Sequence, residues 1–305
     1  MGKYNFARNR NKIQTKISTI EYIIVFLNKF SVFLYLNLNT IIMVLEHLIS
    51  VREIRKKPYK IFILSIISTL IAILLTNFLS QNGLFLTFLI TLAILPITIN
   101  NLRLEEKREK YDFFWNYFYS LNFIYRHSEI IVYYLSIIFS IALTISFFYL
   151  ILPPEISTKI FSNQIQIISQ ITGNFSSKEI FSKILLNNLF VVSICFIFSL
   201  FYSTGAIFLI TWNATVLGIA VGQGARQLFG IPSIPLVLLS YLPHGIFEFL
   251  GYVFAGIAGG ILSIAITRHK ENKKHKLFVL KDSVLLFFVG VGFIIIGAIV
   301  ESFLI

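Results

Sequence analysis

The fold is decided by the apolar stretch at residues 61–79, which reads IFILSIISTLIAILLTNFL. It is long enough to cross the hydrocarbon core of a bilayer as a helix, which takes about 20 mostly apolar residues. A second stretch, LFLTFLITLAILPITI at residues 84–99, follows after a short Gln81-Asn82-Gly83 turn. Together the two stretches predict a helical hairpin within a membrane.

The composition extends this prediction to the whole chain. Of its 305 residues, 56% are hydrophobic and 13% are charged, and the mean hydropathy is +0.81. Soluble domains carry about 25% charged residues, so the values exclude an ordinary soluble globule and, more firmly, a disordered chain. We therefore predict an all-α, polytopic membrane protein.

Further crossings are predicted at residues 130–152, 184–210 and 284–303. Between the second and third crossings, residues 111–126 predict a short interfacial helix. Residues 153–183 form the longest polar connection and are expected to be an external loop.

The region 211–260 leaves two alternatives open, because the basic tract 268–281 is expected in the cytoplasm and requires an even number of crossings before it. Either residues 212–230 and 235–267 each cross once, or the first segment is re-entrant and the second is broken near Gly251. The prediction is therefore about six transmembrane helices, with a re-entrant or broken helix as the alternative in 211–260.

Charge sets the predicted orientation. The chain has 26 Lys and Arg against 14 Asp and Glu, a net charge of +12, but the basic residues cluster between apolar runs as cytoplasmic loops do. We therefore expect basic cytoplasmic loops, an external C-terminus and no nucleic-acid partner. The basic residues that flank the hairpin are Arg52, Arg55, Lys56, Lys57, Lys60, Arg103, Lys107, Arg108 and Lys110.

Residues 1–42 fit this scheme poorly, since a crossing there would place the next basic cluster outside. They are expected to be an amphipathic interfacial segment or, alternatively, upstream sequence that is not made in the cell, with Met43 as the start. Residues 43–305 are predicted to form a single transmembrane domain.

Two ionisable residues within a predicted span call for an explanation, because a central charge costs about 2.5–3.5 kcal/mol on insertion scales. His244 and Glu248 lie four residues apart in LPHGIFE (242–248), so they share one helix face. They could bind a cation, relay protons or ligate a lipid headgroup. The alternative is a polar brace between helices, with Pro243 opening the helix.

Other polar residues in apolar surroundings are Asn187, Asn188, Asn213 and Arg226. The asparagines are expected to hydrogen-bond between helices. Arg226 either snorkels to an interface or meets Glu248, if its segment is re-entrant.

Several kinds of chemistry find no motif in the chain. H-E-x-x-H, G-x-x-x-x-G-K-[ST] and G-x-S-x-G are absent, and Cys195 is the single cysteine. We therefore expect no catalytic residue, metal site or cofactor. The remaining histidines, among them His127, are expected at the surface, and residues 105–112 are expected to form a solvated face.

An ordered set of motifs resembles the stage II sporulation protein M family in its archaeal form, over about residues 43–305. It comprises RKKPY (55–59), LLNNL (185–189), GAI (205–207), TWNA (211–214), LPHGIFE (242–248), AGIAGG (255–260) and Arg268-His269.

The resemblance implies a polytopic membrane protein that acts through partners. In spore-forming bacteria the family member anchors and helps to localise peptidoglycan-degrading proteins and is not itself the hydrolase. The archaeal branch generally lacks spores and murein, so that role does not carry over, and the resemblance supplies no catalytic residues.

The expectation is therefore a non-enzymatic scaffold or assembly factor in the lipid bilayer. It would recruit an unidentified membrane or cell-envelope protein, and a second copy of the chain is a further candidate partner. The alternative is a transporter or lipid-handling protein that uses the polar His244/Glu248 region. An intramembrane enzyme, with Glu248 or His244 as general base, is the third hypothesis.

Overall fold

The computed structural model describes residues 51–115, 127–171, 177–268 and 273–304, which belong to one compact unit, Ser50–Ile305. The predictions for residues 1–42, and most of the interfacial helix expected at 111–126, concern residues outside these ranges.

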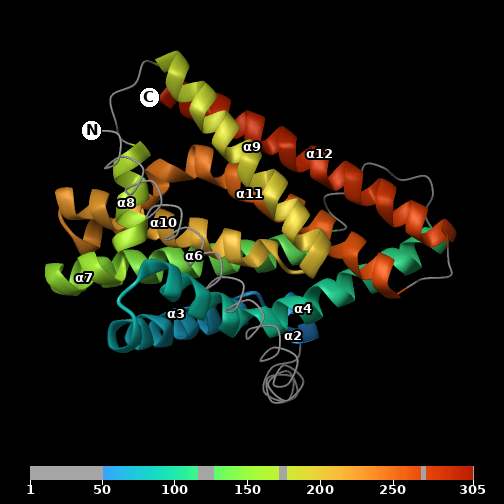
Figure 1. The fold of residues 1–305 in the computed structure, drawn as a ribbon, viewed down its shortest axis with the longest axis horizontal. Helices are drawn as coiled ribbons and strands as arrows, with labels where there is room; N and C mark the ends of the chain where they lie inside the picture. Colours follow the sequence, from blue (N-terminus) through green and yellow to red (C-terminus); the bar gives the residue numbers. More distant parts are fainter. Residues whose placement is uncertain (1–50, 116–126, 172–176, 269–272, 305) are drawn as a thin grey trace, which may run out of the picture. The chain divides into compact units, whose positions relative to one another are not determined.

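Within these ranges the secondary structure is helical throughout (Figure 1). The elements are α2 (Val51–Lys56), α3 (Tyr59–Leu79), α4 (Gly83–Trp115), α6 (Ser128–Ile151), α7 (Pro154–Ile160), α8 (Ser162–Ile171), α9 (Ser177–Tyr202), α10 (Ala206–Gln227), the 3-10 turn η2 (Ile231–Ser233), α11 (Ile234–Arg268) and α12 (Lys273–Leu304).

Seven of the described helical segments are long and apolar enough to cross a membrane. This confirms the all-α polytopic fold, with seven candidate crossings where the sequence predicted about six. The seven are Tyr59–Leu79, Gly83–Lys107, Ser128–Ile151, Ile184–Tyr202, Ala206–Gln227, Ile231–Thr267 and Val279–Phe303.

The predicted hairpin at the start of the bundle is confirmed. α3 ends at Leu79 and α4 begins at Gly83. Gln81 adopts a positive φ of 46° in the turn, and the side chain of Asn82 accepts a hydrogen bond from the Leu84 backbone N–H at 2.8 Å. Asn82 thus satisfies one of the donors that a helix start leaves open.

The crossing predicted at 184–210 is confirmed over Ile184–Tyr202, but it ends before residue 210 because the chain turns at Ser203. α9 ends at Tyr202 and α10 begins at Ala206. Ser203 adopts a φ of 58°, and Ser199 Oγ accepts a hydrogen bond from the Ala206 backbone N–H at 3.0 Å. The sequence signal was Ser203-Thr204-Gly205, three poor helix formers within an apolar run.

In the region 211–260 the structure favours the first alternative, two separate helices. α10 is a complete helix of 22 residues, and α11 runs without a break through Gly251 even though Pro243 lies inside it. Both are among the candidate crossings.

The polar connection at 153–183, expected to be an external loop, is mostly helical in its described residues. It contains the short helices α7 and α8 and the first turns of α9. Gln164 of α8 is fully buried, and its Nε2 donates to Gly83 O at 3.1 Å and to Thr215 Oγ1 at 3.2 Å. One carboxamide therefore joins α8 to both α4 and α10.

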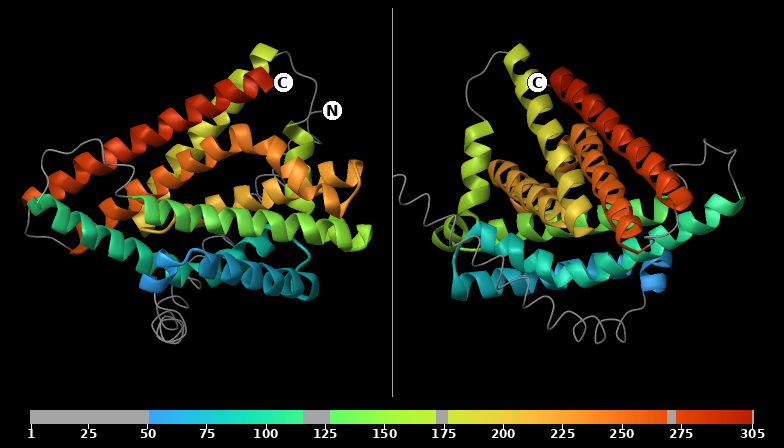
Figure 2. Two further views of the ribbon diagram at one scale, coloured as in Figure 1. Left: turned by 180° about the vertical axis from the view of Figure 1, so that it is seen from behind. Right: turned by 45° about the vertical axis from the view of Figure 1, so that its right-hand side comes forward.

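α11 is the central helix of the described bundle and packs on α9, α12 and α10 (Figure 2). Glycines permit the contacts: a Cβ at Gly259 would lie 2.3 Å from Phe196 O of α9, and one at Gly251 would lie 2.6 Å from Ile294 Cδ1 of α12. Small residues at helix crossings let backbones approach closely in membranes. Both glycines lie in residues 251–265, the stretch of α11 in which every residue is buried.

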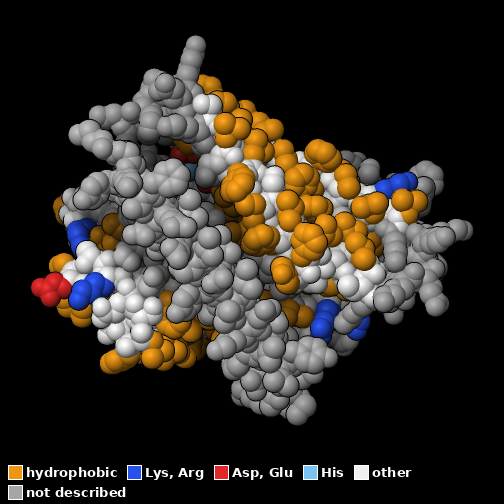
Figure 3. All heavy atoms as spheres, in the orientation of Figure 1, with side chains coloured by type: hydrophobic (Ala, Val, Ile, Leu, Met, Phe, Trp, Pro, Cys, Tyr) orange, Lys and Arg blue, Asp and Glu red, His pale blue; other side chains and the backbone are white. Residues whose placement is uncertain are grey.

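The outward faces of α9 and α12 expose large apolar side chains, as the hydrophobic surface over these helices shows (Figure 3). Such a surface is stable against lipid tails or against another membrane protein. The most exposed members are Leu186, Phe190, Phe201 and Tyr202 on α9 and Phe288 and Phe303 on α12.

Candidate functional site

Asn188 of α9 is the centre of a polar cluster between α9 and α11. Its Nδ2 donates to Glu248 Oε1, and its Oδ1 accepts a hydrogen bond from the Tyr252 hydroxyl at 2.8 Å. Asn188 is 5% exposed and Tyr252 is 2% exposed. We call these three residues the polar brace, because each bond joins one helix to the other.

The local sequence explains why the brace forms. Glu248 and Tyr252 are four residues apart, so they lie on one face of α11, and the bond geometry directs both side chains to Asn188. An amide offers donors and an acceptor at once, which suits it to a carboxyl and a hydroxyl together.

His244 lies one helical turn before Glu248, as the spacing predicts. Within the part of the chain that the structure describes, the buried Nδ1 of His244 has no hydrogen-bond partner. Its ring packs edge-on against Tyr241, with centroids 6.0 Å apart. His244 is therefore a neighbour of the polar brace and not a member of it.

α12 closes the cluster from the third side. Gly297 lies against α11, where a Cβ would meet Phe247 Cβ at 3.3 Å and both Glu248 Cγ and the His244 carbonyl oxygen at 3.4 Å. Glu301, one turn further along α12, lies within electrostatic range of Glu248. Two acidic side chains thus lie near one another at a helix contact.

The structure brings only some of the predicted residues together. Asn187 is exposed, and its Nδ2 donates to Asn188 Oδ1 at 3.3 Å. Asn213 donates to its own helix, at Leu209 O, 2.8 Å away. Arg226 does not meet Glu248; its Nη2 donates to Tyr149 O at 2.6 Å. Asn213 and Arg226 therefore lie outside the cluster.

A second polar cluster was not predicted, and it contains several deeply buried charged residues. Arg55 Nη1 of α2 lies 2.8 Å from Glu105 Oε2 of α4. His127, at the start of α6, lies 2.7 Å from Glu105 (Nδ1 to Oε1) and 3.8 Å from Asp282 of α12 (Nε2 to Oδ2). These four residues, here named the charge cluster, join four helices.

The burial of the charge cluster corrects two expectations. His127 is fully buried, not at the surface, and Glu105 is 1% exposed, not on a solvated face. Arg55 also donates from Nη2 to Asn101 O at 2.7 Å. Buried charges persist only when they are paired and hydrogen-bonded, and this network pairs them.

Electrostatics favour a charged imidazole in this cluster. Burial disfavours the imidazolium, but the hydrogen bonds and charges of Asp282 and Glu105 outweigh it, so the pKa of His127 is raised above its ordinary 6.5. The sequence held no clear signal for this cluster. Arg55, Glu105 and Asp282 flank apolar spans, where charges usually mark only topology.

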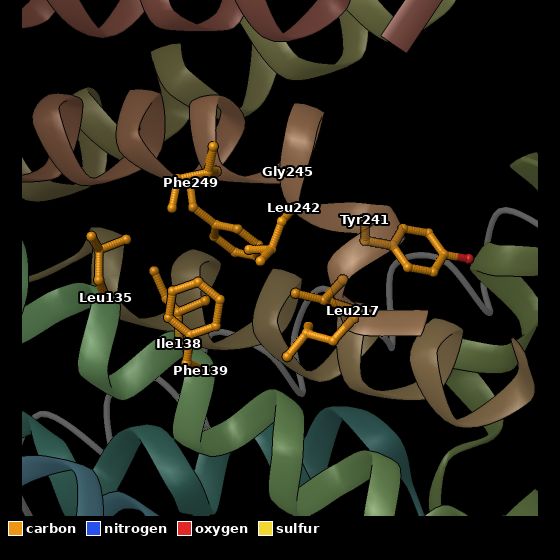
Figure 4. A pocket seen from close by; sticks show the side chains of 10 residues that line it. Leu135, Ile138, Phe139, Leu217, Tyr241, Leu242, Gly245 and Phe249 are labelled. Atoms are coloured by element: carbon orange, nitrogen blue, oxygen red, sulfur yellow. The ribbon is translucent and has the colours of Figure 1, made fainter. Parts of the chain in front are cut away.

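The space beside His244 is small and apolar. Between α6, α10 and α11 lies a pocket of about 10 Å³, room for about one water molecule. Figure 4 shows Phe249, Leu242 and Ile138 around it, with the Tyr241 hydroxyl directed away. The described residues contain no group of three or more His, Cys, Asp or Glu that could hold a metal ion.

One comparison with known proteins identifies a family. The family model described as "Stage II sporulation protein M" matches residues 130–304, which include the polar brace and all but the first two residues of α6. An uncharacterized protein of Methanocaldococcus jannaschii is 26% identical over 129 residues, which are 41% of this chain and 70% of the relative. No solved structure matches this chain.

Proposed function

This chain belongs to the stage II sporulation protein M family, and on that premise we propose that it is a non-enzymatic membrane scaffold or assembly factor. In this account it holds a membrane or cell-envelope protein at the bilayer and performs no chemistry of its own.

The observation that carries the proposal is the use of the polar brace. Asn188, Glu248 and Tyr252 form hydrogen bonds with one another between α9 and α11. The nearby apolar pocket has room for about one water molecule. A transporter needs a polar cavity of solute size near the bilayer midplane. The polar brace therefore supports a role in holding helices together.

The partner would then dock on an outer surface. The exposed face of α9 carries Phe190, 65% exposed, and Phe201, 74% exposed. The opposite face of α9 packs on α11 and α12. We place the partner on this face because Asn187, an exposed amide, gives it a polar contact within apolar surroundings.

The proposed orientation rests on charge. Lys56, at the end of α2, and Lys57, directly after it, precede the first candidate crossing, and the basic tract 268–281 follows the sixth. An even number of crossings therefore separates the two basic groups. The positive-inside rule places these ends in the cytoplasm. The α7–α8 end and the C-terminus would then be external.

The test is site-specific photo-crosslinking in cells, followed by purification in a mild detergent. A crosslinker at Phe190 is compared with one at Phe78 of α3, which is 81% exposed and serves as the lipid-facing control. We expect one dominant protein adduct, in stoichiometric amount, from Phe190 and none from Phe78. An adduct with a second copy would make the chain its own partner.

The opposite result would support a transporter or lipid-handling protein. That result is a protein recovered without a crosslinked partner from either position, but with one lipid or solute enriched. In that case His244 would be the first residue to change.

A further inference from the structure

Arg226, in the last turn of α10, lies on an aromatic support. Its guanidinium carbon is 4.3 Å from the centroid of the Tyr149 ring, and its Nη2 donates to Tyr149 O at 2.6 Å. A cation over a ring face is held electrostatically, and the hydrogen bond fixes the plane of the group. This bond uses one of the five N–H donors that arginine carries.

Tyr149 is itself held from two sides. Its ring packs on the backbone of α10, where a Cβ at Gly222 would lie 2.8 Å from Tyr149 Cδ1. The ring of Phe161, between α7 and α8, lies beside it, with the two ring centroids 6.2 Å apart. Tyr149 is 6% exposed, whereas Arg226 is exposed. Three parts of the fold therefore present one cation outward in a set orientation.

Beside this cation the chain exposes an apolar tip. Phe229 is 85% exposed and Leu228 is 50% exposed. Two hydrogen bonds order the tip. Phe229 N donates to the Ser233 side-chain Oγ at 3.0 Å, and Gly230, with a φ of 75°, donates from N to Ala225 O at 2.8 Å. An ordered, exposed aromatic at the end of a span is stable where headgroups and lipid tails meet.

The charge of Arg226 is not neutralised within residues 51–115, 127–171, 177–268 and 273–304, since no carboxylate there forms an ion pair with it. Arginine stays protonated in proteins, and its planar fork of donors matches the oxygens of a phosphate. An anion with apolar tails would satisfy the cation and the tip together.

We propose that Arg226, supported by Tyr149 and flanked by Phe229, binds the phosphate of a phospholipid headgroup. The phosphate accepts hydrogen bonds from the guanidinium, while the acyl chains lie against the Phe229 tip. A soluble phosphate would satisfy the cation but leave the tip without a contact. This lipid site is independent of the partner-binding face proposed on α9.

The test is native mass spectrometry of the detergent-purified full chain, titrated with dioleoyl phosphatidylglycerol. Dioleoylglycerol, which has the same tails and no phosphate, is the matched lipid control. We expect retention of the phospholipid only. Arg226→Gln should lower its affinity about tenfold or more, the effect of losing charge-assisted hydrogen bonds. Lys159→Gln removes an exposed cation of α7 and should leave the affinity unchanged.

Two further measurements separate the alternatives. Phe229→Ser changes a side chain that is almost fully exposed, so the variant should fold. It should weaken phospholipid retention severalfold, and it tests the lipid site if Arg226→Gln fails to fold. Inorganic phosphate is the competitor that identifies a soluble ligand. Equal phospholipid retention by Arg226→Gln or Phe229→Ser and wild type would overturn the proposal, as would full displacement of the lipid by inorganic phosphate.

Discussion

Asn188 of α9 and Glu248 of α11 are joined by a direct hydrogen bond from the amide Nδ2 to the carboxyl Oε1. The bond joins two helices through residues that are 60 positions apart in sequence. One turn further along α11, the Tyr252 hydroxyl donates a second hydrogen bond to Asn188 Oδ1. The most prominent polar motif of the sequence is therefore part of the helix packing.

Glu248→Ala should destabilise the bundle, because it removes the acceptor and leaves a buried amide donor without a partner. The expected loss in the free energy of unfolding is about 1–2 kcal/mol, measured by thermal melting in detergent. Glu248→Gln is the control: its amide oxygen can still accept the Asn188 bond, so it should melt close to wild type. Equal melting temperatures for all three proteins would refute the brace.

Breaking the charge cluster should cost more. Arg55→Ala or Glu105→Ala leaves an uncompensated buried charge, for which losses of about 3–5 kcal/mol are usual. Lys57→Ala, at an exposed position of the same segment, should change stability by less than about 0.5 kcal/mol. The double variant Arg55→Ala/Glu105→Ala should lose less than the sum of the two singles; strict additivity would show that the 2.8 Å contact carries no coupling.

Stability should depend on pH through His127. Its pKa is raised in the folded protein, so its contribution is fully present below the unfolded pKa of about 6.5. The contribution is lost as the pH rises through the folded value. We expect the melting temperature to fall on going upward from about pH 6.5, and His127→Gln to remove most of that slope. A slope that survives the substitution would assign it to other groups.

Gly83→Ala should disturb the contact between α4 and α8. A Cβ at Gly83 would lie 1.9 Å from Gln164 Oε1, so the buried carboxamide would have to leave its place. The melting temperature should drop, and the second change Gln164→Ala should restore part of it. Gly292→Ala is the matched control, since nothing lies within 4 Å of its Cβ position. A Gly83→Ala protein as stable as the Gly292→Ala protein would contradict this packing.

The sequence predicted those features that depend on local patterns. The hairpin turn at 81–83 follows from polar residues between two apolar runs. Two separate helices in 211–260 were one of the two alternatives that the run lengths allowed. The turn at Ser203 was missed because three small residues inside a long apolar stretch do not interrupt its hydropathy. The charge cluster was missed because charges beside spans are usually solvated. His127 and Glu105 are buried only through the packing of α2, α6 and α12 around them.

The pairing inside the candidate site was also beyond a sequence pattern. Spacing placed His244 and Glu248 on one face, but the choice of partner depends on which helix covers that face. Because α9 covers it, Glu248 bonds to Asn188, and His244 lies beside Tyr241.

The central claim is that Glu248 and Tyr252 of α11 hold helices together and that His244 beside them does not act on a substrate. Its most direct test is rescue of a gene-deletion strain by His244→Gln. Growth, the abundance of the protein and its melting temperature are measured in the same cells. The account predicts that rescue follows the amount of folded protein. A variant with wild-type abundance and melting temperature that fails to rescue the strain would contradict it and would make His244 a functional group.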